Sequence, residues 1–451
     1  MKDKIKKAEQ GLKKVERNLK KTEENIKRVV KKNILKVLKP QAFLQISKIR
    51  QKIIKLASDA KLPDFSLYSP NTMAKALHPR QQFLVISEVI DHHNGYKSFV
   101  FLPDLEAGTT KLAFAAAGQY ISFTLKIGDS LVSRPYSLSS SPKDSLEGKY
   151  MVTIKRIDGG FCSNYMIENW KVGTKVIATA PQNVLVYDSL RDAKTVVGVA
   201  GGSGITPFYS MAQAIADGDE DFNLILLYGT RNLKDVVFLD ELKALEKKCD
   251  KIKVVNIFSD EESGADGVSM DSNATNTATR STPSVENLII EKGFITADII
   301  KKYAPADSDY SVFMCGPEVM YRAVDKECEK LGIKKKFIRH GANDEYKNPE
   351  LDEAYDKKKI GTYSLTVRIH GEEQTIPCAS NESLLIALER AGITVQTQCR
   401  RGTCGWCHSK LVSGEVFISP TYDKRRQADK EYGYVHPCCT FPMSDVELYL
   451  E

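Results

Sequence analysis

The chain has 451 residues, 42% of them hydrophobic and 27% charged, with a formal net charge of +7. This length and composition predict a soluble globular protein of about three domains. No apolar run reaches the roughly 18 residues needed to span a bilayer, and the lysine-rich N-terminus lacks the apolar stretch of a secretory signal. We therefore expect a cytoplasmic protein, where clustered cysteines bind metal or act in catalysis more often than they form disulfides.

The positive charge is concentrated at the N-terminus. Residues 1–61 contain 20 of the 65 Lys and Arg residues and 6 of the 58 Asp and Glu residues, which leaves 45 basic and 52 acidic residues in the remainder. Apolar residues recur every seven positions from Ile5 to Ile26, and Pro40 is expected to end or kink this first helix. Residues 1–76 are therefore predicted to form a basic amphipathic helical segment.

Such a segment has more than one kind of partner. Basic amphipathic helices bind anionic membrane surfaces, acidic proteins or each other. Residues 1–60 are accordingly expected to hold the protein at the periphery of a membrane or in a complex, or else to pack on the protein itself. No nucleic-acid binding is expected, because no aromatic interleaving or known binding motif accompanies the charge.

The rest of the chain is predicted to be multidomain, of α+β and α/β class. Short β-branched and aromatic runs over residues 77–190 favour an antiparallel β-barrel. Strands alternate with helices over 191–342, which predicts a parallel sheet, and residues 260–285 within it have the composition of a surface insertion. A charged linker over 343–361 leads to a last unit at 362–451, where a hairpin precedes a helix.

Three cysteines lie close together in this last unit, in the stretch "QCRRGTCGWCHSK". Cys399, Cys404 and Cys407 have the spacing C-x4-C-x2-C, and Cys438 follows after 30 residues. This is the plant-type ferredoxin spacing for a [2Fe–2S] cluster, which takes four thiolates. Structural zinc more often uses two separate C-x2–4-C pairs, and disulfides are disfavoured in a reducing compartment. We therefore predict a [2Fe–2S] cluster on these four cysteines.

Two details of the cluster region stay open. The fourth ligand is Cys438 or the adjacent Cys439; the segment "HPCCTFP" resembles the plant-type ferredoxin ending, in which a proline lies four residues after the ligand, so Pro442 favours Cys438. Trp406 and the loop around it are expected to lie where electrons leave the cluster, although a packing role is the plainer alternative for this side chain.

The predicted barrel contains a motif with the chemistry of a flavin site, "RPYSLSSSP". Arg134 offers a fixed charge for a phosphate, Tyr136 an aromatic face and Ser137 a hydroxyl, with Pro135 between them. The motif is short, and it indicates a flavin site only together with the other motifs of the chain.

A second motif, "IDGGFCSNYM", follows it. Gly159 and Gly160 precede Phe161 and a helix expected to start near Ser163. The free N–H groups of a helix N-terminus suit a diphosphate. The alternative is a simple glycine turn with Ser163 as the N-cap.

The predicted parallel sheet carries a glycine-rich turn between a buried strand and a helix, "GVAGGSGITPFYSMA". Gly201, Gly202 and Gly204 let the backbone approach a pyrophosphate at the helix N-terminus. Two later segments support this interpretation: "YGTRNLKDVVFLDEL", where Arg231 stands at a position that could read a 2′-phosphate, and "MCGPEVM".

In this order, the motifs of residues 80–451 resemble the ferredoxin–NADP reductase superfamily, in a form with a C-terminal ferredoxin unit. The resemblance implies that Gly201–Pro207 bind the nicotinamide dinucleotide, with Thr206 near the nicotinamide. It also implies that Cys315, with Gly316 and Pro317, lies at the contact between nicotinamide and flavin and helps to position the hydride. FAD is favoured over FMN, and NADH over NADPH.

The resemblance further implies a function. NAD(P)H would pass a hydride to the flavin, and single electrons would leave through the [2Fe–2S] cluster to a downstream redox enzyme or electron-transfer protein. The alternatives are the reductase component of an oxygenase, and a membrane- or complex-bound subunit docked through its N-terminal helices.

Overall fold

The computed structural model describes residues 21, 24, 48–53, 69–92, 94–182, 185–260, 288–341, 345–369 and 371–450. The chain divides into two compact units, residues 1–72 and 73–451, which are treated separately. In the first unit, Lys21, Glu24 and residues 48–53 are helical, and the rest of the predicted amphipathic segment, Pro40 included, lies outside the described residues. A helix over Ser69–Leu77, α3, follows.

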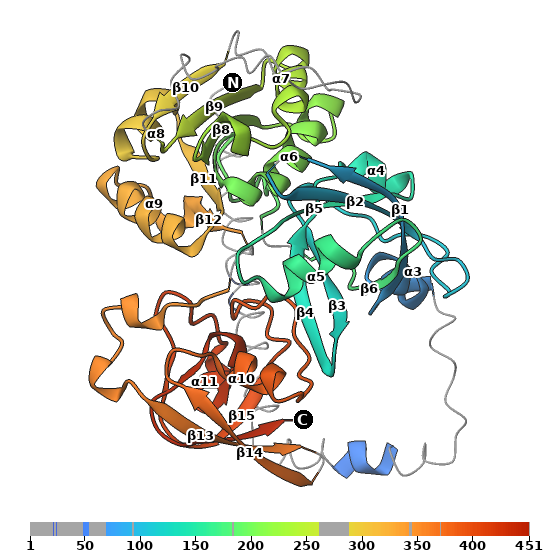
Figure 1. Ribbon diagram of the computed structural model, residues 1–451, viewed down its shortest axis with the longest axis vertical. Helices are drawn as coiled ribbons and strands as arrows, with labels where there is room; N and C mark the ends of the chain where they lie inside the picture. The colour runs from blue at the N-terminus through green and yellow to red at the C-terminus, as the bar shows by residue number, and fades with distance from the viewer. Residues whose placement is uncertain are drawn as a thin grey trace, which may run out of the picture. The chain divides into compact units, whose positions relative to one another are not determined.

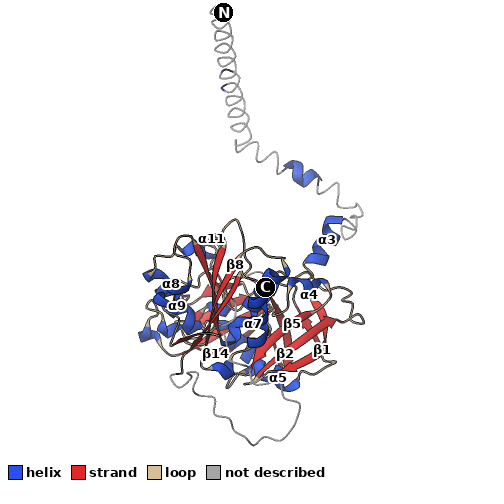
Figure 2. Ribbon diagram, turned by 90° about the horizontal axis from the view of Figure 1, so that it is seen from above, coloured by secondary structure: helices blue, strands red, loops and turns tan. Residues whose placement is uncertain are grey.

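The first sheet of the larger unit is antiparallel, as the spacing of short strands predicts. Its strands pair in the order β4-β3-β6-β1-β2-β5, and β1, β2 and β5 lie side by side in Figures 1 and 2. An isolated bridge between Leu138 and Val152 links the two ends of the sheet, which gives it the curvature of a partial barrel. Its elements are β1 Gln82–Asp91, β2 Tyr96–Pro103, β3 Tyr120–Ile127, β4 Ser130–Ser137, β5 Tyr150–Lys155, β6 Lys175–Ala178, α4 Pro142–Leu146 and α5 Phe161–Asn169.

The core of this sheet is aromatic. Phe99, Phe101 and Phe123 project from β2 and β3 onto Trp170, with ring centroids 5.3, 5.8 and 5.0 Å from it. The edge-to-face geometry is the one that aromatic quadrupoles prefer. Because Trp170 is the C-cap of α5, these contacts hold the helix that carries the second predicted flavin motif against the sheet.

The second sheet is parallel, as the alternation of strands and helices predicts. Its order is β10-β9-β8-β7-β11-β12, and every observed pairing is parallel. The central strand β7 is buried along almost its whole length, which is the pattern of a sheet covered on both faces. Its elements are β7 Thr195–Gly201, β8 Asn223–Thr230, β9 Ile252–Phe258, β10 Ile289–Lys292, β11 Tyr310–Cys315, β12 Ile338–His340, α6 Thr206–Asp217, α7 Leu239–Lys248, α8 Ala297–Tyr303 and α9 Glu318–Lys330.

Chain order and sheet order diverge at β7, because β8 lies on one side of it and β11 on the other. Open parallel sheets bind ligands in the crevice at the carboxyl ends of strands at such a point. Residues 261–287, which hold most of the predicted insertion, lie outside the described residues.

The C-terminal region, drawn in orange to red in Figure 1, is a mixed sheet covered by a helix. Its order is β14-β13-β19-β15-β17, with β13 and β19 parallel and the other pairs antiparallel. The predicted hairpin is β13–β14, and the helix after it is α10, which completes a β-grasp arrangement. The elements are β13 Thr362–Ile369, β14 Glu372–Ala379, β15 Ser409–Ser413, β16 Val416–Phe417, β17 Tyr434–Val435, β18 Phe441–Pro442, β19 Val446–Leu450, α10 Leu384–Arg390 and α11 Gln427–Glu431.

The predicted linker is packed where the structure describes it. Tyr346 and Tyr355 are buried with Phe417, Phe441 and Met443 of the C-terminal region. The hydroxyl of Tyr355 donates to the carbonyl of Ser380 at 3.1 Å. The segment before β13 therefore contributes apolar side chains to this region. Among the described residues of the whole chain, no helix is both long and apolar enough to cross a membrane.

Candidate functional site

The predicted nucleotide residues meet where β7 and β11 end. A short 3-10 helix, η2 (Gly202–Ile205), connects β7 to α6, which begins at Thr206. A Cβ on Gly204 would lie 1.9 Å from the carbonyl oxygen of Cys315, and one on Gly201 would lie 3.0 Å from Cδ of Pro317. The Cα of Gly201 is 3.1 Å from the Cβ position of Gly316. Only glycine permits this approach, so the structure brings the predicted residues of both segments together.

The start of α6 has the form of an anion-binding end. Gly202 has φ +52°, and no side chain caps either η2 or α6. Thr206 is buried, and its hydroxyl donates to the Ser203 carbonyl at 3.2 Å; Pro207, the next residue, has no N–H to offer. Uncapped N–H groups at a helix N-terminus favour a phosphate.

Cys315 is fully buried at the end of β11, where Tyr321 and Gly341 surround it. Burial raises the pKa of its thiol to about 12, against smaller lowering effects of Arg401 and Tyr321. A thiol that stays protonated at neutral pH is a poor nucleophile. The predicted role of Cys315 is therefore one of contact and position, and it stays a prediction.

Arg231 lies just beyond the end of β8. Its side chain is 69% exposed, and Nε donates to Oδ2 of the buried Asp235 at 2.8 Å. An acidic side chain at this place in a dinucleotide-binding sheet suits the free 2′-hydroxyl of NADH, whereas a 2′-phosphate needs cationic partners. Arg231 was predicted from the sequence, whereas Asp235 was not.

The first predicted flavin motif lies at the end of β4, antiparallel to β3. Tyr136 stands opposite Ile121, and its ring lies 6.1 Å from that of Phe123. Ser137 is buried opposite Tyr120, and Pro135 stands opposite Ser122. These residues occupy one end of the strand pair, next to the C-terminal region.

Arg134 is engaged with protein groups. It donates from Nη1 to the Ser133 carbonyl at 2.9 Å and to the Glu389 carboxylate at 3.4 Å. Its Nε lies 3.9 Å from Oε1 of Glu345. The predicted phosphate contact of Arg134 stays a prediction, and any phosphate would share the guanidinium with these carboxylates.

The second predicted flavin motif forms the start of α5. The helix begins at Phe161, two residues before the predicted start, with Gly160 as N-cap and without a side-chain cap bond. A Cβ on Gly160 would lie 2.5 Å from Oγ of Ser163, which packs the glycine against the first turn, and Gly159 has φ +68°. Ser163 thus lies inside the helix and is not its N-cap. The first N–H groups of the helix therefore stay available to donate to a ligand.

The predicted cluster cysteines converge in the C-terminal region. Sγ of Cys407 and Cys438 are 3.4 Å apart, close enough for both thiolates to bind one iron. Sγ of Cys399 accepts the N–H groups of Arg401 at 3.5 Å and of Cys404 at 3.3 Å. Backbone donors directed at sulfur suit thiolates that carry negative charge.

This loop has the backbone that close packing around a cluster requires. Arg400, Gly402 and Gly405 all have positive φ, at 56°, 73° and 74°. A non-glycine residue in this region is strained unless its surroundings hold it. Among the described residues, no three His, Cys, Asp or Glu side chains converge as one metal ion would need. The four thiols fit a two-iron cluster, in which each iron takes two of them.

The two candidates for the fourth ligand differ in environment. Sγ of Cys438 accepts the Gly402 N–H at 3.2 Å and faces Cys407. Sγ of Cys439 donates to the His436 carbonyl at 3.6 Å and lies 2.6 Å from the Cβ position of Gly402. The geometry favours Cys438, in line with the prediction from Pro442.

The cluster loop also contacts the antiparallel sheet. Tyr120, the first residue of β3, is buried against Cys399 and Cys404. Oγ of Ser122 donates to the Gln398 carbonyl at 3.2 Å, and Oγ of Ser130 donates to the Glu389 carbonyl at 3.4 Å. The β3–β4 hairpin therefore connects the predicted flavin residues to the predicted cluster, and Figure 1 shows it pointing toward α10.

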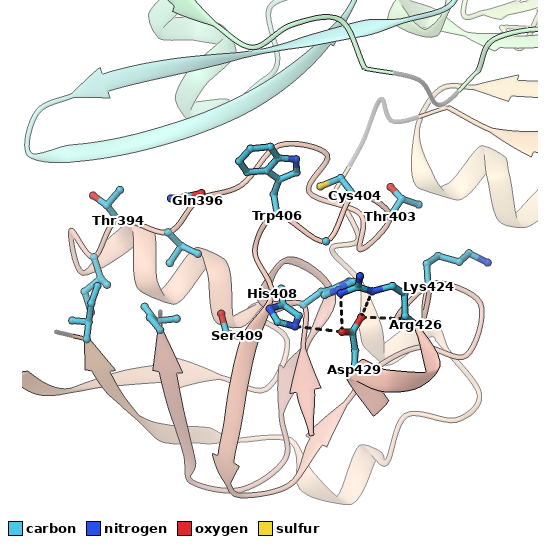
Figure 3. A pocket seen from close by; sticks show the side chains of 16 residues that line it. Thr394, Gln396, Thr403, Cys404, Trp406, His408, Ser409, Lys424, Arg426 and Asp429 are labelled. Atoms are coloured by element: carbon cyan, nitrogen blue, oxygen red, sulfur yellow. Dashed lines mark hydrogen bonds and ion pairs between the residues drawn. The ribbon is translucent and has the colours of Figure 1, made fainter. Parts of the chain in front are cut away.

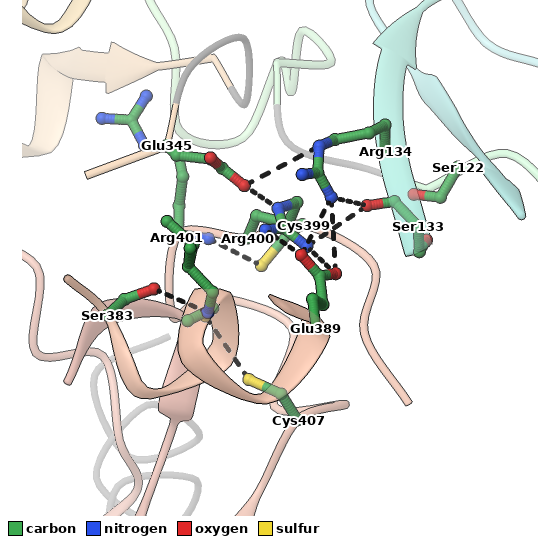
Figure 4. Close-up of polar contacts among 12 residues, drawn as sticks. Ser122, Ser133, Arg134, Glu345, Ser383, Glu389, Cys399, Arg400, Arg401 and Cys407 are labelled. Atoms are coloured by element: carbon green, nitrogen blue, oxygen red, sulfur yellow. Dashed lines mark hydrogen bonds and ion pairs between the residues drawn. The ribbon is translucent and has the colours of Figure 1, made fainter. Parts of the chain in front are cut away.

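Arg400 forms the centre of a buried ion-pair network at this contact (Figure 4). Its side chain is 1% exposed and donates from Nη1 and Nη2 to Glu389 at 2.5 and 2.9 Å, and from Nε to Glu345. Arg134 approaches the same two carboxylates from β4. Burial raises the pKa of Glu389 to about 7, and Arg134 opposes this. Two arginines and two glutamates thus neutralise one another between the regions.

Arg401, the next residue, points to the parallel sheet. Nη1 donates to the carbonyl of Gly341 at 2.7 Å, and the guanidinium lies 4.5 Å from the ring centroid of Tyr321. The Tyr321 hydroxyl donates to the same carbonyl at 3.2 Å and accepts the Gly316 N–H at 3.3 Å. The side chain of Tyr321 therefore links Arg401 of the cluster loop to the predicted nicotinamide residue Gly316.

A hollow borders the cluster loop (Figure 3). Its volume is about 1050 Å³, and Cys404, Trp406, His408, Lys424 and Arg426 are among its lining residues. Trp406 is 44% exposed. Cys404 is less buried than the other three predicted ligands, so the hollow marks where the predicted cluster comes nearest to the surface of the C-terminal region.

The residues that join the three regions were not predicted from the sequence; they are Tyr120, Tyr321, Glu345 and Glu389. Tyr120 stands inside the segment "AGQYISF", so proximity to a flavin motif was its only signal. The two glutamates and Tyr321 carry no local signal, because their partners are distant in sequence.

Three family models match the chain, in the order that the motifs predict. They are the oxidoreductase FAD-binding domain over residues 89–187, the oxidoreductase NAD-binding domain over 199–275, and the 2Fe-2S iron-sulfur cluster binding domain over 367–443. The predicted FAD, nicotinamide dinucleotide and [2Fe–2S] cofactors are thereby confirmed at the level of domains.

Relatives and solved structures share this organisation. The chain is 23% identical to the glycine betaine monooxygenase reductase subunit of Chromohalobacter salexigens, over 85% of this chain and 98% of the relative. It is 27% identical to the ferredoxin reductase component of 3-ketosteroid-9-alpha-monooxygenase from Mycobacterium tuberculosis, over 80% and 93%. The structure of phthalate dioxygenase reductase has the same fold, with a TM-score of 0.53 and 22% identity, over 82% of this chain and 98% of that one.

Proposed function

We propose that this chain, which belongs to the iron–sulfur flavoprotein reductases of the ferredoxin–NADP reductase superfamily, supplies a terminal oxygenase with electrons from NADH. The protein is an NAD(P)H-dependent electron-transfer oxidoreductase, with FAD, NAD and [2Fe–2S] domains in one chain. The oxygenase as acceptor is taken from the names of its relatives, which are reductase components of monooxygenases.

The observation that carries the proposal is the position of the cluster loop. Arg400 and Arg401 stand between Cys399 and Cys404 and contact the antiparallel and the parallel sheet, respectively. Tyr120 packs on two of the cysteines, and its strand partner is Ser137 of the flavin motif. These contacts place the residues of the three proposed sites next to one another, so that electrons could pass in sequence.

The residues of the chain would bind the flavin, the nucleotide and the cluster and orient them relative to one another. When bound, the flavin would accept two electrons as a hydride and the cluster would pass them on singly. We assign Tyr136 and Ser137 to the flavin ring, Arg134 to a flavin phosphate, and the α5 start at Gly159–Ser163 to the diphosphate. Gly201–Pro207 hold the nucleotide, Cys315–Pro317 position the nicotinamide, and Cys399, Cys404, Cys407 and Cys438 hold the cluster.

NADH is the proposed donor rather than NADPH. Arg231 stands just beyond the end of β8, and its Nε is already bonded to Asp235. The buried carboxylate of Asp235 would repel a 2′-phosphate, and it can accept a hydrogen bond from a 2′-hydroxyl. A comparison of kcat/KM for the two nucleotides measures the preference directly, and a higher value with NADPH would contradict this assignment.

The hollow beside Trp406 is the proposed docking place for the acceptor. It is lined by Cys404 and Trp406 of the cluster loop (Figure 3). Trp406 offers an exposed aromatic face, and buried aromatic side chains are frequent anchors of interfaces. Trp406→Ala should slow reduction of a protein acceptor while leaving the reduction of ferricyanide unchanged.

The proposal is tested by anaerobic reduction of the purified protein with NADH. We expect the flavin absorbance to bleach first and the EPR signal of a reduced [2Fe–2S] cluster to follow within the same protein. Reconstitution with a candidate oxygenase should then couple NADH oxidation to product formation. A folded, colourless protein containing zinc would contradict the proposal.

Residues 1–60 are proposed to bind a partner, on their charge alone. Twenty basic residues against six acidic ones within residues 1–61 suit an acidic protein or an anionic membrane surface. Deletion of residues 1–60 should leave NADH-dependent ferricyanide reduction intact and abolish binding to the natural acceptor or to anionic vesicles. If neither acceptor binding nor vesicle binding changes, the segment has a structural role. The domain limits proposed at residues 76, 190, 342 and 361 can be tested by further truncations at those positions.

A further inference from the structure

Arg134 stands between the proposed flavin-phosphate site and the C-terminal region. It belongs to β4, next to Pro135 and Tyr136 of the first flavin motif. Burial raises the pKa of the Cys162 thiol, in the first turn of α5, and the nearby charge of Arg134 is the largest effect that opposes this. On its other side, Arg134 reaches Glu389 of α10 (Figure 4). One guanidinium therefore lies between the helix start assigned to the diphosphate and the carboxylates of the C-terminal region.

Arg134 holds these carboxylates loosely. Its Nη1 lies 3.4 Å from both oxygens of Glu389, and its Nε lies 3.9 Å from Oε1 of Glu345. Among the described residues, its Nη2 has no hydrogen-bond partner (Figure 4). Arg400 binds the same two glutamates more closely, with Nη1 and Nη2 at 2.5 and 2.9 Å from Glu389. Because long hydrogen bonds are weak, Arg134 is the member of this network that a ligand can withdraw at the lower cost.

The charges of the network balance only while Arg134 belongs to it. Two guanidinium groups face two carboxylates, Glu389 from α10 and Glu345 from the segment before β13. If Arg134 turns to a phosphate, Arg400 alone remains with both carboxylates, which leaves one negative charge beside the buried Glu389. An uncompensated buried carboxylate is unfavourable, and the uptake of a proton relieves it.

Glu389 is the carboxylate placed to take up that proton. Burial raises its pKa to about 7, and Arg134 opposes this rise, so the withdrawal of Arg134 raises the pKa further. The thiol of Cys162 also faces the network and stays neutral, because burial raises its pKa. Arg400, from the cluster loop, and Glu345 are the other charged groups of the network.

We propose that Glu389 competes with a phosphate of FAD for Arg134, so that the C-terminal region limits the affinity of the protein for FAD. When FAD binds, Arg134 passes from the carboxylates to the phosphate, and Glu389 takes up one proton from solvent. The inference rests on the proposed function, which assigns Arg134 to a flavin phosphate. It adds that the loading of the flavin site and the charge of the region that carries the cluster depend on each other.

The test measures the affinity of the full, cluster-loaded chain for FAD. Dilution of the holoenzyme releases FAD, whose fluorescence gives the Kd. Glu389→Gln should lower this Kd about tenfold near neutral pH, because the competing carboxylate is lost and the network gains one excess positive charge. Glu373→Gln removes an equal charge at an exposed side chain of β14 and should leave the Kd unchanged. A Kd that stays the same or rises in Glu389→Gln is the result of a purely structural carboxylate and overturns the proposal.

The proton provides a second measurement. Because binding takes up a proton, the affinity falls as the pH rises through the range in which Glu389 of the flavin-free protein loses its own proton. The wild-type Kd for FAD should therefore rise severalfold between about pH 7 and about pH 8, a range in which the diphosphate of FAD does not titrate. Glu389→Gln cannot exchange this proton, so its Kd should stay constant over the same range. A wild-type Kd independent of pH, or a slope that persists in Glu389→Gln, contradicts the exchange.

A second glutamate guards against a variant that fails to fold. Glu345 is half-buried and farther from Arg134 than Glu389 is. Glu345→Gln should therefore lower the Kd for FAD in the same direction but by a smaller factor. The melting temperature and the EPR signal of the reduced cluster report whether each variant has folded. If Glu389→Gln does not fold, a Kd that Glu345→Gln leaves unchanged overturns the proposal.

Two outcomes separate this inference from the proposed function. If the wild type binds FAD and neither glutamate variant binds it more tightly, the competition is overturned and the function stands. If the wild type binds neither FAD nor FMN, the proposed function is contradicted together with the inference.

Discussion

The nucleotide end and the cluster end of the proposed electron path are built by different means. At the nucleotide end, Gly204 and Cys315 meet backbone to backbone, with no room for a Cβ between them. At the cluster end, the buried Arg400 and Glu389 and the half-buried Arg134 and Glu345 meet as charges that neutralise one another. The first end depends on the absence of side chains, and the second on their charge.

The difference indicates how each end should respond to change. Backbone contact at van der Waals distance tolerates no added atom, since protein interiors are close-packed. A buried ion-pair network tolerates changes of shape better than the loss of one partner, which leaves a charge uncompensated. Substitutions at the two ends should therefore affect different steps of electron transfer, and the following variants test this.

The largest effect is expected for Cys438→Ser. Loss of one of the four thiolates should remove nearly all of the cluster, measured as protein-bound iron and sulfide and by EPR of the reduced protein. Cys439→Ser is the matched control and should keep the cluster, since Sγ of Cys439 bonds to the His436 carbonyl. Loss of the cluster in Cys439→Ser alone would reverse the ligand assignment.

The next largest effect is expected for Gly204→Ala, at the nucleotide end. Its Cβ would lie 1.9 Å from the Cys315 carbonyl oxygen, so β11 and η2 must separate, at a cost of about 3 kcal/mol or more. Reduction of the flavin by NADH should nearly cease, while the iron content stays normal. In the control, Gly229→Ala, the added Cβ lies 3.5 Å from the Ala200 carbonyl oxygen. Normal flavin reduction in Gly204→Ala would show that this turn does not hold the nucleotide.

A smaller effect is expected for Arg400→Gln, at the cluster end. Removal of one partner of a buried charge pair costs about 3–5 kcal/mol, and here it takes the Arg400 guanidinium away from both Glu389 and Glu345. Stopped-flow reduction should show a slower step from flavin to cluster with an unchanged step from NADH to flavin. Arg390→Gln is the control: its guanidinium is 48% exposed, and its ion pair with Glu382 is worth less than about 1 kcal/mol. Equal behaviour of the two variants would argue against the network.

The smallest effect is expected for Arg401→Gln, which lies between the two ends. The variant loses a bond to the Gly341 carbonyl and the contact over Tyr321, together worth about 1.5–3 kcal/mol. Because Tyr321 also accepts the Gly316 N–H, the KM for NADH should rise severalfold even though residue 401 lies in the cluster loop. Arg401→Lys should recover part of this loss. An unchanged KM with a slower transfer from flavin to cluster would place Arg401 with Arg400 instead.

Much of the arrangement follows from local sequence. The C-x4-C-x2-C spacing and the glycines at positions 201, 202 and 204 express constraints between residues near in the chain, and short-range constraints leave a pattern that can be recognised. The same holds for the sheets, since strand spacing distinguishes the antiparallel from the parallel one. The start of α5 was predicted two residues late because Gly160, rather than Ser163, is the cap.

Contacts between regions were decided by the tertiary structure alone. Arg400 and Arg401 are neighbours of like charge, and nothing in "CRRGTC" tells that one meets Glu345 and Glu389 and the other Gly341. Their partners lie 11 to 60 positions away in the chain. The sequence by itself determined which cofactors the chain is built for, because each cofactor is bound by a local motif. Only the fold determined how the motifs face one another, because that depends on packing between segments that share no local pattern.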